Sequence, residues 1–477
     1  MHITQPVVVV NAPRWPVLLL IVMCMMSGLS ACVTVANAPH IIQRAEAAPE
    51  QVEIEGTKRT LSAAASDRAI QKITHDDESE ALLQRHLQVE QQVADSPLFA
   101  GNNAHLLFDG KETFDAKYEA IDSAKHHINL EYFIFENVKL KGVTLEALLL
   151  KKRAQGVAVN IIYDAFGSSG TPVEFFDNLK KAGVKMTEFH PVDLENIGNI
   201  NYRDHRKILI VDGQLAIIGG INLSATYHSK SKFGKSGARN RAAAQTDVNS
   251  AHWRDTDMQL VGPAVAELQR LFLAHWDVAQ PIDQTTFFPV IEKKGNELIR
   301  VIGSSPINDL PRYYITLMSA MTSAEKEIAL SAAYFVPTKD EKEALMQAAQ
   351  RGVNVDLLLP GISDAKLAIY VQQSHYSDLL DAGVRIYESH SEVLHAKTVT
   401  IDGVWSVIGS SNFDYRSAAL NSEIDLVVLG RQTADELKAK FKEDAGKAKK
   451  IDKTAWHRRP ITQKLKELFS RVFEQML

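Results

Sequence analysis

The sequence predicts an α/β protein built from two homologous α/β sandwich halves, related by a pseudo-twofold axis and sharing one active site. Two observations support this fold class. Apolar runs typical of buried strands alternate with amphipathic helical segments along most of the chain. The stretch NYRDHRKILIVDGQLAIIGGIN at 201–222 also recurs as HAKTVTIDGVWSVIGSSN at 395–412, with its shared residues offset by 190 positions. A chain of 477 residues is long enough for two such cores.

Residues 1–31 predict a signal peptide of the lipoprotein type. Arg14 precedes an apolar run at 17–26, and small residues follow it. The sequence LSAC at 29–32 resembles the lipobox of bacterial lipoproteins, in which Cys32 is lipidated and becomes the mature N-terminus. An uncleaved transmembrane anchor over 15–36 is the alternative. Both predict a membrane-anchored protein of the cell envelope facing the periplasm or exterior, and Val33 resembles an outer-membrane sorting signal.

Residues 32–95 predict a tether and a short helix. The segment is polar and rich in Ala, Glu and Gln, which favours a tether over 37–66 and a helix within 76–94. Both cysteines of the chain lie in the leader, so no disulfide or cysteine-based metal site is expected after Cys32. The net charge of −5 gives no general attraction to nucleic acid, and we expect no nucleic-acid partner.

The first half is predicted to span 96–285. A helix around 120–124, a strand at 128–135, a second helix and a buried strand ending at 164 open it. Two further strands, at 208–211 and 215–218, flank a turn at Asp212 and Gly213. Residues 227–250 are rich in Ser, Lys, Arg, Asn and Ala and predict an inserted loop. Its basic residues either form a solvated charge run or meet anionic headgroups at the rim of the cleft.

The second half, 286–435, follows the same plan. A helix at 314–324 and a strand at 328–336 match their counterparts, and LLDAGVRIYESH at 379–390 matches LKKAGVKMTEFH at 179–190. The last segment, 436–477, is predicted to be helical. Its apolar face docks either onto the core of the protein or, as the alternative, onto a membrane. That face comprises Leu465, Leu468, Phe469, Val472, Phe473 and Met476.

Each motif supplies the groups that phosphoryl chemistry needs. Lys207 and Lys397 are ammonium groups, which are poor metal ligands but good phosphate clamps, and Asn222 and Asn412 add neutral donors to phosphoryl oxygens. If the two motifs converge, these groups neutralise the charge that develops at phosphorus. The histidines of the motifs then divide the remaining roles, one attacking phosphorus and the other protonating the leaving alcohol. These histidines are His205 and His395.

Four carboxylates complete the candidate site. Asp212 and Asp402 close the pattern HxKxxxxD and are candidate catalytic residues, but each precedes a glycine, so holding a turn is the alternative. The segments WRDTDMQLVG and NSEIDLVVLG align, which equates Asp255 with Glu423. These two acids are candidates for orienting the histidines, because an imidazole needs a partner at its second nitrogen. Ion pairs with nearby arginines are the alternative for both.

The paired motifs, each followed by G-x-x-N, resemble those of the phospholipase D superfamily and are most similar to bacterial cardiolipin synthases. The segments PLFAGNNAHLLFDG, YDAFGSSG, HWRD, VGPAV and WHRRP add to the resemblance, which covers the chain from residue 96 onward. The resemblance implies that His205 is the nucleophile, that it forms a phosphatidyl-histidine, and that His395 is the general acid and later base. It also implies that no metal or other cofactor is required.

The resemblance implies transfer of a phosphatidyl group from one phosphatidylglycerol to another, with release of glycerol. A phospholipase D hydrolase or transphosphatidylase, using water or another alcohol as acceptor, is the alternative. The expected partners are a phospholipid substrate and a membrane. The acidic charge is unfavourable for a nuclease of the superfamily, and the complete set of motif groups is unfavourable for a non-catalytic lipid-binding protein.

Overall fold

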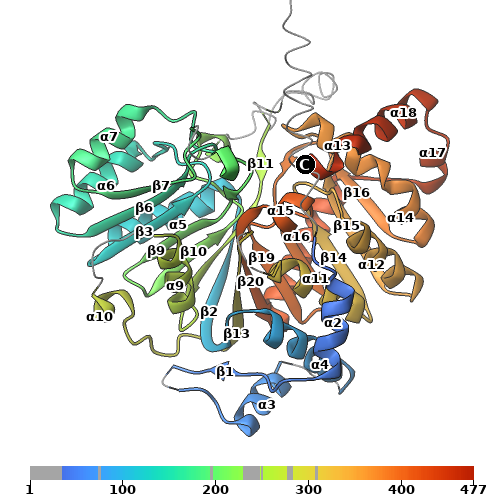
Figure 1. Ribbon diagram of the computed structural model, residues 1–477, viewed down its shortest axis with the longest axis horizontal. Coiled ribbons are helices and arrows are strands. Elements are labelled where there is room, and N and C mark those ends of the chain that lie inside the picture. The colour runs from blue at the N-terminus through green and yellow to red at the C-terminus, as the bar shows by residue number, and fades with distance from the viewer. Residues whose placement is uncertain are drawn as a thin grey trace, which may run out of the picture.

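The structure is a computed structural model that describes residues 35–57, 59–73, 77–193, 197–228, 248, 251–276, 283–306 and 310–477. The predicted signal peptide with Cys32, and all but a few residues of the predicted insertion at 227–250, lie outside the described residues. Figure 1 shows the two halves side by side, the first in cyan to green and the second in orange to red. The predicted fold class is confirmed.

The first half is a seven-stranded sheet in the order β2, β12, β10, β9, β3, β6, β7. The first five strands pair antiparallel, and the last two continue in parallel. Its main elements are β2 (Leu98–Phe108), α5 (Asp109–Ser123), β3 (His127–Tyr132), α6 (Leu145–Ala154), β6 (Ala158–Asp164), α7 (Val173–Lys181), β7 (Lys185–Phe189), β9 (Lys207–Val211), β10 (Leu215–Gly219), β12 (Thr256–Val261) and α9 (Val265–His275).

The second half repeats this order and these strand directions as β13, β20, β19, β18, β14, β15, β16. Helix α16 follows β20 as α9 follows β12, so the second half extends to residue 447 rather than to the expected 435. Its main elements are β13 (Glu297–Ser304), α11 (Arg312–Ser323), β14 (Glu327–Ser331), α12 (Lys339–Gln350), β15 (Asn354–Pro360), α13 (Lys366–Ser374), α14 (Tyr376–Ala382), β16 (Arg385–Ser389), β18 (Thr398–Ile401), β19 (Trp405–Gly409), α15 (Tyr415–Ala419), β20 (Asn421–Leu429) and α16 (Arg431–Lys447).

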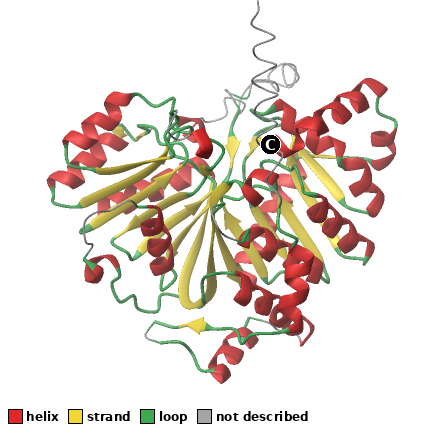
Figure 2. Cartoon of the chain, viewed as in Figure 1, coloured by secondary structure: helices red, strands yellow, loops and turns green. Residues whose placement is uncertain are grey.

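Strand β2 joins the two sheets into one. Its residues 98–102 pair antiparallel with β13, and its residues 103–108 pair antiparallel with β12. The change of partner occurs beside Gly101, whose φ of 96° favours a residue without a side chain. Figure 2 shows the result, a fan of strands that runs through the middle of the molecule with helices on its outer faces. The two halves therefore share a hydrogen-bonded backbone as well as a packed interface.

The segment expected to be a tether is folded against the second half. Helices α2 (Ala38–Ala47), α3 (Ala63–Gln71) and α4 (Asp77–Val93) occupy it, and α2 and α4 contact α11. The expectation of a tether over 37–66 is wrong for α2, because a few apolar side chains such as Ile42 are enough to bury one helical face. Glu90 of α4 anchors this layer, 3.2 Å from Arg300 and accepting a 2.8 Å bond from Trp405.

The C-terminal segment contains α17 (Lys453–His457), α18 (Ile461–Ser470) and a 3₁₀ helix (Arg471–Met476). The expectation that its apolar face docks onto the core is wrong for four of the six residues. Phe473 and Met476 are half-buried. The exposed residues are Leu465, Leu468, Phe469 and Val472.

None of the helices in the described part of the chain is long and apolar enough to cross a membrane.

Candidate active site

Both motifs open onto one cavity. His205 and Lys207 lie at the start of β9, and His395 and Lys397 lie just before the equivalent strand β18. Because the halves face each other across the pseudo-twofold axis, both histidines and both motif asparagines line a single cavity of about 470 Å³. The same cavity is lined by two arginines, the buried Arg203 and the partly buried Arg416. The structure therefore brings together the two half-sites that the sequence predicts.

The histidines and their acids are paired across the two halves. His205 Nδ1 lies 2.9 Å from Glu423 Oε2, and His395 Nδ1 lies 2.6 Å from Asp255 Oδ2. The contact between carboxylate and imidazole that the sequence predicts is thus present in both cases, with each acid supplied by the opposite half. A carboxylate at Nδ1 holds the hydrogen on that nitrogen, which leaves Nε2 with a lone pair directed away from the acid. Both imidazoles are therefore set to act through Nε2.

The arginines do not compete for these carboxylates. Arg254 Nε lies 2.7 Å from Asp444, and its contact with Asp255 is with the backbone oxygen rather than the carboxylate. Arg416 donates to the backbone oxygen of Asn201 at 3.0 Å. The alternative of ion pairs with nearby arginines, considered for Asp255 and Glu423, is therefore wrong.

Burial sets the protonation of the site. Removal from water, together with the neighbouring Lys207, lowers the pKa of His205 to about 4, although Glu423 opposes the shift. Burial and Lys397 likewise lower the pKa of His395. Burial on its own would raise the pKa of Glu423, but His205 and Lys207 outweigh it and bring that pKa to about 2. At neutral pH the site therefore holds two neutral imidazoles, of which one is paired with a firmly ionised carboxylate.

The lysines lie beside the histidines that they follow. Lys207 Nζ and Lys397 Nζ each donate to the backbone oxygen of the histidine two residues earlier, and Lys397 Nζ also lies 3.0 Å from His395 Nδ1. Burial and the mutual repulsion of the two ammonium groups lower the pKa of Lys207 to about 7. Such poorly hydrated cations gain strongly from a phosphate dianion or monoanion placed between them.

Tyr227 belongs to the site, although the sequence places it at the edge of a low-complexity insertion. Its hydroxyl lies 3.3 Å from His395 Nδ1 and accepts a 3.3 Å bond from Asn222 Nδ2, so it links the two motifs. The rings of Trp253 and Tyr334 also contact His395, at centroid distances of 5.2 and 6.3 Å. Only the position of HWRD directly after the insertion offered a signal for Trp253, and nothing in the local sequence marks Tyr227.

Asp212 and Asp402 are bound to backbone N–H groups. Each lies at the end of its strand opposite to the histidine, in a turn with a positive φ of 54° and 53°. The Asp212 carboxylate accepts hydrogen bonds of 2.7 to 2.9 Å from the backbone N–H groups of residues 125–127, and Asp402 does the same for residues 325–327 at 2.8 to 2.9 Å. These contacts support the alternative that both aspartates hold a turn, and their assignment as catalytic residues stays a prediction.

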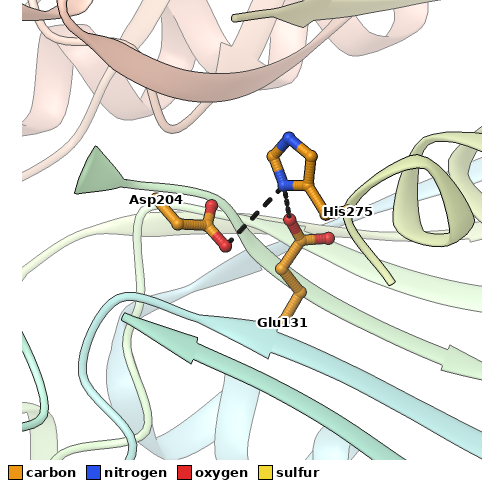
Figure 3. Close-up of side chains that lie close together, drawn as sticks. All are labelled: Glu131, Asp204 and His275. Atoms are coloured by element: carbon orange, nitrogen blue, oxygen red, sulfur yellow. Dashed lines mark hydrogen bonds and ion pairs between the residues drawn. The ribbon is translucent and has the colours of Figure 1, made fainter. Parts of the chain in front are cut away.

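One cluster of metal-type ligands exists among the described residues. His275 Nδ1 lies 2.7 Å from Glu131 Oε1 and 3.9 Å from Asp204 Oδ2, as Figure 3 shows. Arg206 Nη1 lies in the same group, 3.5 Å from Glu131 and 3.3 Å from His275. A guanidinium thus already balances the carboxylates, and the cluster ties the residues that flank His205 to β3 and α9. It serves as a support for the segment around His205 rather than as a built cation site.

Comparison with known proteins places these features in context. A family model described as "Cardiolipin synthase, PLD-like domain" matches residues 118–232 and 317–445. A cardiolipin synthase of Geobacillus sp. (strain WCH70) is 32% identical over 398 residues, covering 82% of this chain and 76% of that protein. Cardiolipin synthase 1 of Bacillus anthracis is 31% identical, covering 82% and 75%. The fold is similar to that of phosphatidylserine synthase from Haemophilus influenzae, with a TM-score of 0.59, 12% identity and coverage of 81% and 97%.

Proposed function

The chain belongs to the family of cardiolipin synthases built from phospholipase D-like domains, and on this premise we propose that it transfers a phosphatidyl group from one phosphatidylglycerol to another. The products are cardiolipin and glycerol, and the intermediate is a phosphatidyl group bound covalently to a histidine. The observation that carries the proposal is the pair of histidines at one cavity, each held at Nδ1 by an acid of the other half.

In the first step His205 Nε2 attacks the phosphorus of phosphatidylglycerol. The new N–P bond forms as the bond from phosphorus to the glycerol oxygen breaks. His395 takes up a proton from the solvent as the anionic phosphate binds, and its Nε2 then gives that proton to the leaving oxygen. The imidazolium that His205 becomes is stabilised by the ionised Glu423 at Nδ1. Lys207, Lys397 and the two motif asparagines neutralise the oxygens of the five-coordinate phosphorus.

In the second step the leaving glycerol is replaced by the terminal hydroxyl of a second phosphatidylglycerol. His395 Nε2, now neutral, takes the hydroxyl proton while the oxygen attacks phosphorus and the N–P bond breaks. The proton returns to His395 and His205 returns to its starting state, so the cycle is balanced without a metal or cofactor entering any step. The same intermediate would also react with water, which is the hydrolase alternative.

Two carboxyl groups of the cavity wall are candidates for binding a glycerol headgroup. Asp364 lines this wall, and its Oδ1 accepts a 2.7 Å bond from Tyr334 and a 3.0 Å bond from Ser363. Asp414 lines it as well, and burial raises the pKa of Asp414 to about 7. Oxygen acceptors held beside the general acid suit the two hydroxyls of a glycerol headgroup, both as leaving group and as acceptor.

The product distribution tests this proposal. Purified full-length protein is incubated with phosphatidylglycerol vesicles, and lipids and free glycerol are measured together. Cardiolipin and glycerol in equal amounts are expected, with no product from the His205→Ala variant. Phosphatidic acid without cardiolipin would reject the synthase in favour of the hydrolase, and a product formed equally well by His205→Ala would reject the phosphohistidine.

A phospholipid substrate also bears on where the protein is located, because such a substrate lies in a membrane. We propose that Cys32 carries a lipid anchor that holds the protein on the periplasmic or exterior side of a membrane, with the outer membrane as one destination. The lipobox-like residues 29–32 and a substrate that lives in bilayers support this. Metabolic labelling with a fatty-acid analogue should mark the wild type and not Cys32→Ala. Equal labelling of both would reject the lipoprotein assignment.

A further inference from the structure

Helix α18 presents its polar side to the protein and its apolar side to solvent. Its buried residues are Glu467 and Ser470, and Glu467 is held by Arg459 at 2.6 Å. The exposed apolar residues recur at spacings of three and four positions, so they form one continuous face of the helix. With their exposed fractions, they are Ile461 (68%), Leu465 (58%), Leu468 (63%), Phe469 (68%) and Val472 (75%). An apolar face of this kind on a solvent-exposed surface marks an interaction site.

The mouth of the active-site cavity continues this apolar surface. Phe166, Val192 and Ile200 line the cavity and are 60%, 52% and 36% exposed, so they lie at its rim. Met476, the last residue of the 3₁₀ helix after α18, and the following Leu477 line the same cavity. In Figure 1, α18 and the C-terminus lie at the top of the view, at the end of the molecule where β11 (Trp253–Arg254) also lies. The chain therefore leads from the apolar face of α18 through the 3₁₀ helix to the wall of the cavity.

The charges around the apolar face are basic. The only acidic residue in α18 is Glu467, which is buried against Arg459. Lys466 and Arg471 are exposed, and so is Arg458 just before the helix. A helix with an apolar face and a basic margin is typical of helices that lie in the surface of an anionic bilayer.

The start of the described chain lies beside the same surface. Val35 and Asn37 line a groove together with Val472 and Gln475. Cys32 precedes Val35 by three residues, so a lipid on Cys32 would be attached within about 10 Å of Val35 along the chain. The proposed anchor and the apolar face therefore meet the membrane from one side of the molecule.

We propose that the exposed face of α18 and the rim of the cavity form one docking surface for an anionic phospholipid bilayer. The surface is defined by Ile461, Leu465, Leu468, Phe469 and Val472 with Phe166, Val192 and Ile200. Docking turns the cavity mouth to the bilayer, so a phosphatidylglycerol headgroup reaches His205 while its acyl chains stay in the apolar layer. This inference rests on the proposed function, because only a lipid substrate has to enter the cavity from a bilayer.

The test separates delivery of lipid from chemistry. The full-length double variant Leu468→Glu/Phe469→Glu is reconstituted in phosphatidylglycerol vesicles, and its turnover is compared with that on dioctanoyl phosphatidylglycerol present as monomers. Turnover in vesicles is expected to fall at least about tenfold, because two buried apolar contacts with the bilayer are replaced by charges. Turnover of the monomeric lipid is expected to stay within about twofold of the wild type, because neither residue lines the cavity.

Val290→Glu is the matched control. Val290 is an equally exposed apolar residue at 84%, and its neighbour Pro289 packs against the turn at Gly213, the end of β9 opposite to His205. This variant should leave both activities unchanged. Equal loss of both activities in the double variant, or loss of neither, would overturn the docking surface. So would a wild-type dimer that the double variant dissociates without loss of vesicle turnover, because the face would then bind a second copy of the chain.

The outcomes also distinguish the two proposals. If the wild type forms no cardiolipin from either form of the lipid, the proposed function fails. If it forms cardiolipin and the double variant is unaffected in vesicles, the function stands and the docking surface alone is rejected.

Discussion

The two halves of the molecule repeat one strand order, yet they surround their acids differently. In the first half, Gly220 makes room for Asp255, because a Cβ at Gly220 would lie 2.2 Å from the Asp255 carboxylate. In the second half the equivalent position is Ser410, whose hydroxyl donates to Glu423 at 2.5 Å. Ser417 and Asn421 also donate to Glu423, at 2.8 and 3.2 Å. Glu423 is thus fixed by several donors, whereas among the described residues the Asp255 carboxylate accepts one further bond, from the backbone N–H of Thr256 at 2.8 Å.

This difference fits a division of labour between the histidines. A carboxylate held ionised by several donors suits His205, which has to carry positive charge while it is bonded to phosphorus. His395 has a less constrained acid but more neighbours on its ring, namely Tyr227, Trp253 and Lys397. Burial and the cation of Lys397 make a protonated His395 a stronger acid, which suits donation to a leaving alkoxide. Near-identical frames therefore hold the proposed nucleophile and the proposed general acid.

Substitution of each histidine in turn should give the largest effects and separate the roles of the two halves most clearly. We expect His205→Ala to lower turnover by about 10⁴-fold or more for every substrate, because no other group forms the intermediate. His395→Ala should be as damaging with phosphatidylglycerol but far less so with a phosphatidyl nitrophenol, whose leaving group needs no proton. Steady-state rates with both substrates measure the split. Equal slowing of the two substrates by His395→Ala would contradict its role as general acid.

Substitution of Glu423 and Asp255 tests whether each acid acts on the histidine of the opposite half. Glu423→Gln lies in the second half but should behave as a defect of His205, slowing both leaving groups by about a hundredfold. Asp255→Asn should resemble His395→Ala and spare the nitrophenol substrate, with a smaller loss on phosphatidylglycerol. Burst kinetics of nitrophenol release report the first step directly. If each variant instead impaired the histidine of its own half, the pairing across the axis would have no catalytic meaning.

Loss of the Lys207 ammonium should appear on the alkaline side of the pH profile. The pKa of Lys207 is lowered to about 7, so the ammonium that clamps phosphate is present below that pH and is lost as the pH rises through it. Accordingly, kcat/KM should fall by up to about tenfold per pH unit above neutrality. Lys207→Arg keeps its charge and should remove this alkaline limb, even at a lower maximal rate. An alkaline limb that persists in Lys207→Arg would assign it to another group.

Where the halves are alike, matched changes should have matched and smaller effects. Asp212→Ala and Asp402→Ala each remove the acceptor of three backbone N–H groups, and each should lower the free energy of unfolding by about 2–4 kcal/mol. The corresponding Asn variants keep one acceptor oxygen and tolerate positive φ, so they should lose less. Chemical denaturation measures stability, and activity per folded molecule should be retained. A selective loss of activity without loss of stability would return these residues to the active site.

Much of the fold followed from local pattern. The apolar runs at 208–211 and 215–218 are strands β9 and β10, and the repeat at 379–390 falls in α14 and β16, the counterparts of α7 and β7. Helix α2 was missed because its three buried side chains are two alanines and Ile42, a weak apolar signal in a polar segment. The pairing of β2 with β13 joins residues far apart in the chain, and no local pattern encodes it.

The site was predictable in its members but not in its connections. Alignment of the halves pointed to Asp255 and Glu423, but each lies 140 or 218 residues from the histidine it binds, so the sequence could not show that the pairs cross. Tyr227 escaped because its neighbours in the chain are small and polar, and only the folded structure brings it to His395. Contacts that depend on how the halves meet are set by the tertiary structure alone.

The shared strand β2 has a consequence for how substrates exchange. Enzymes that release product by moving two lobes apart need a hinge between the lobes. Here the two halves are joined by backbone hydrogen bonds of β2 with both β12 and β13, and moving the halves apart would break these bonds. Glycerol therefore has to leave, and the second lipid has to enter, without a large separation of the two halves.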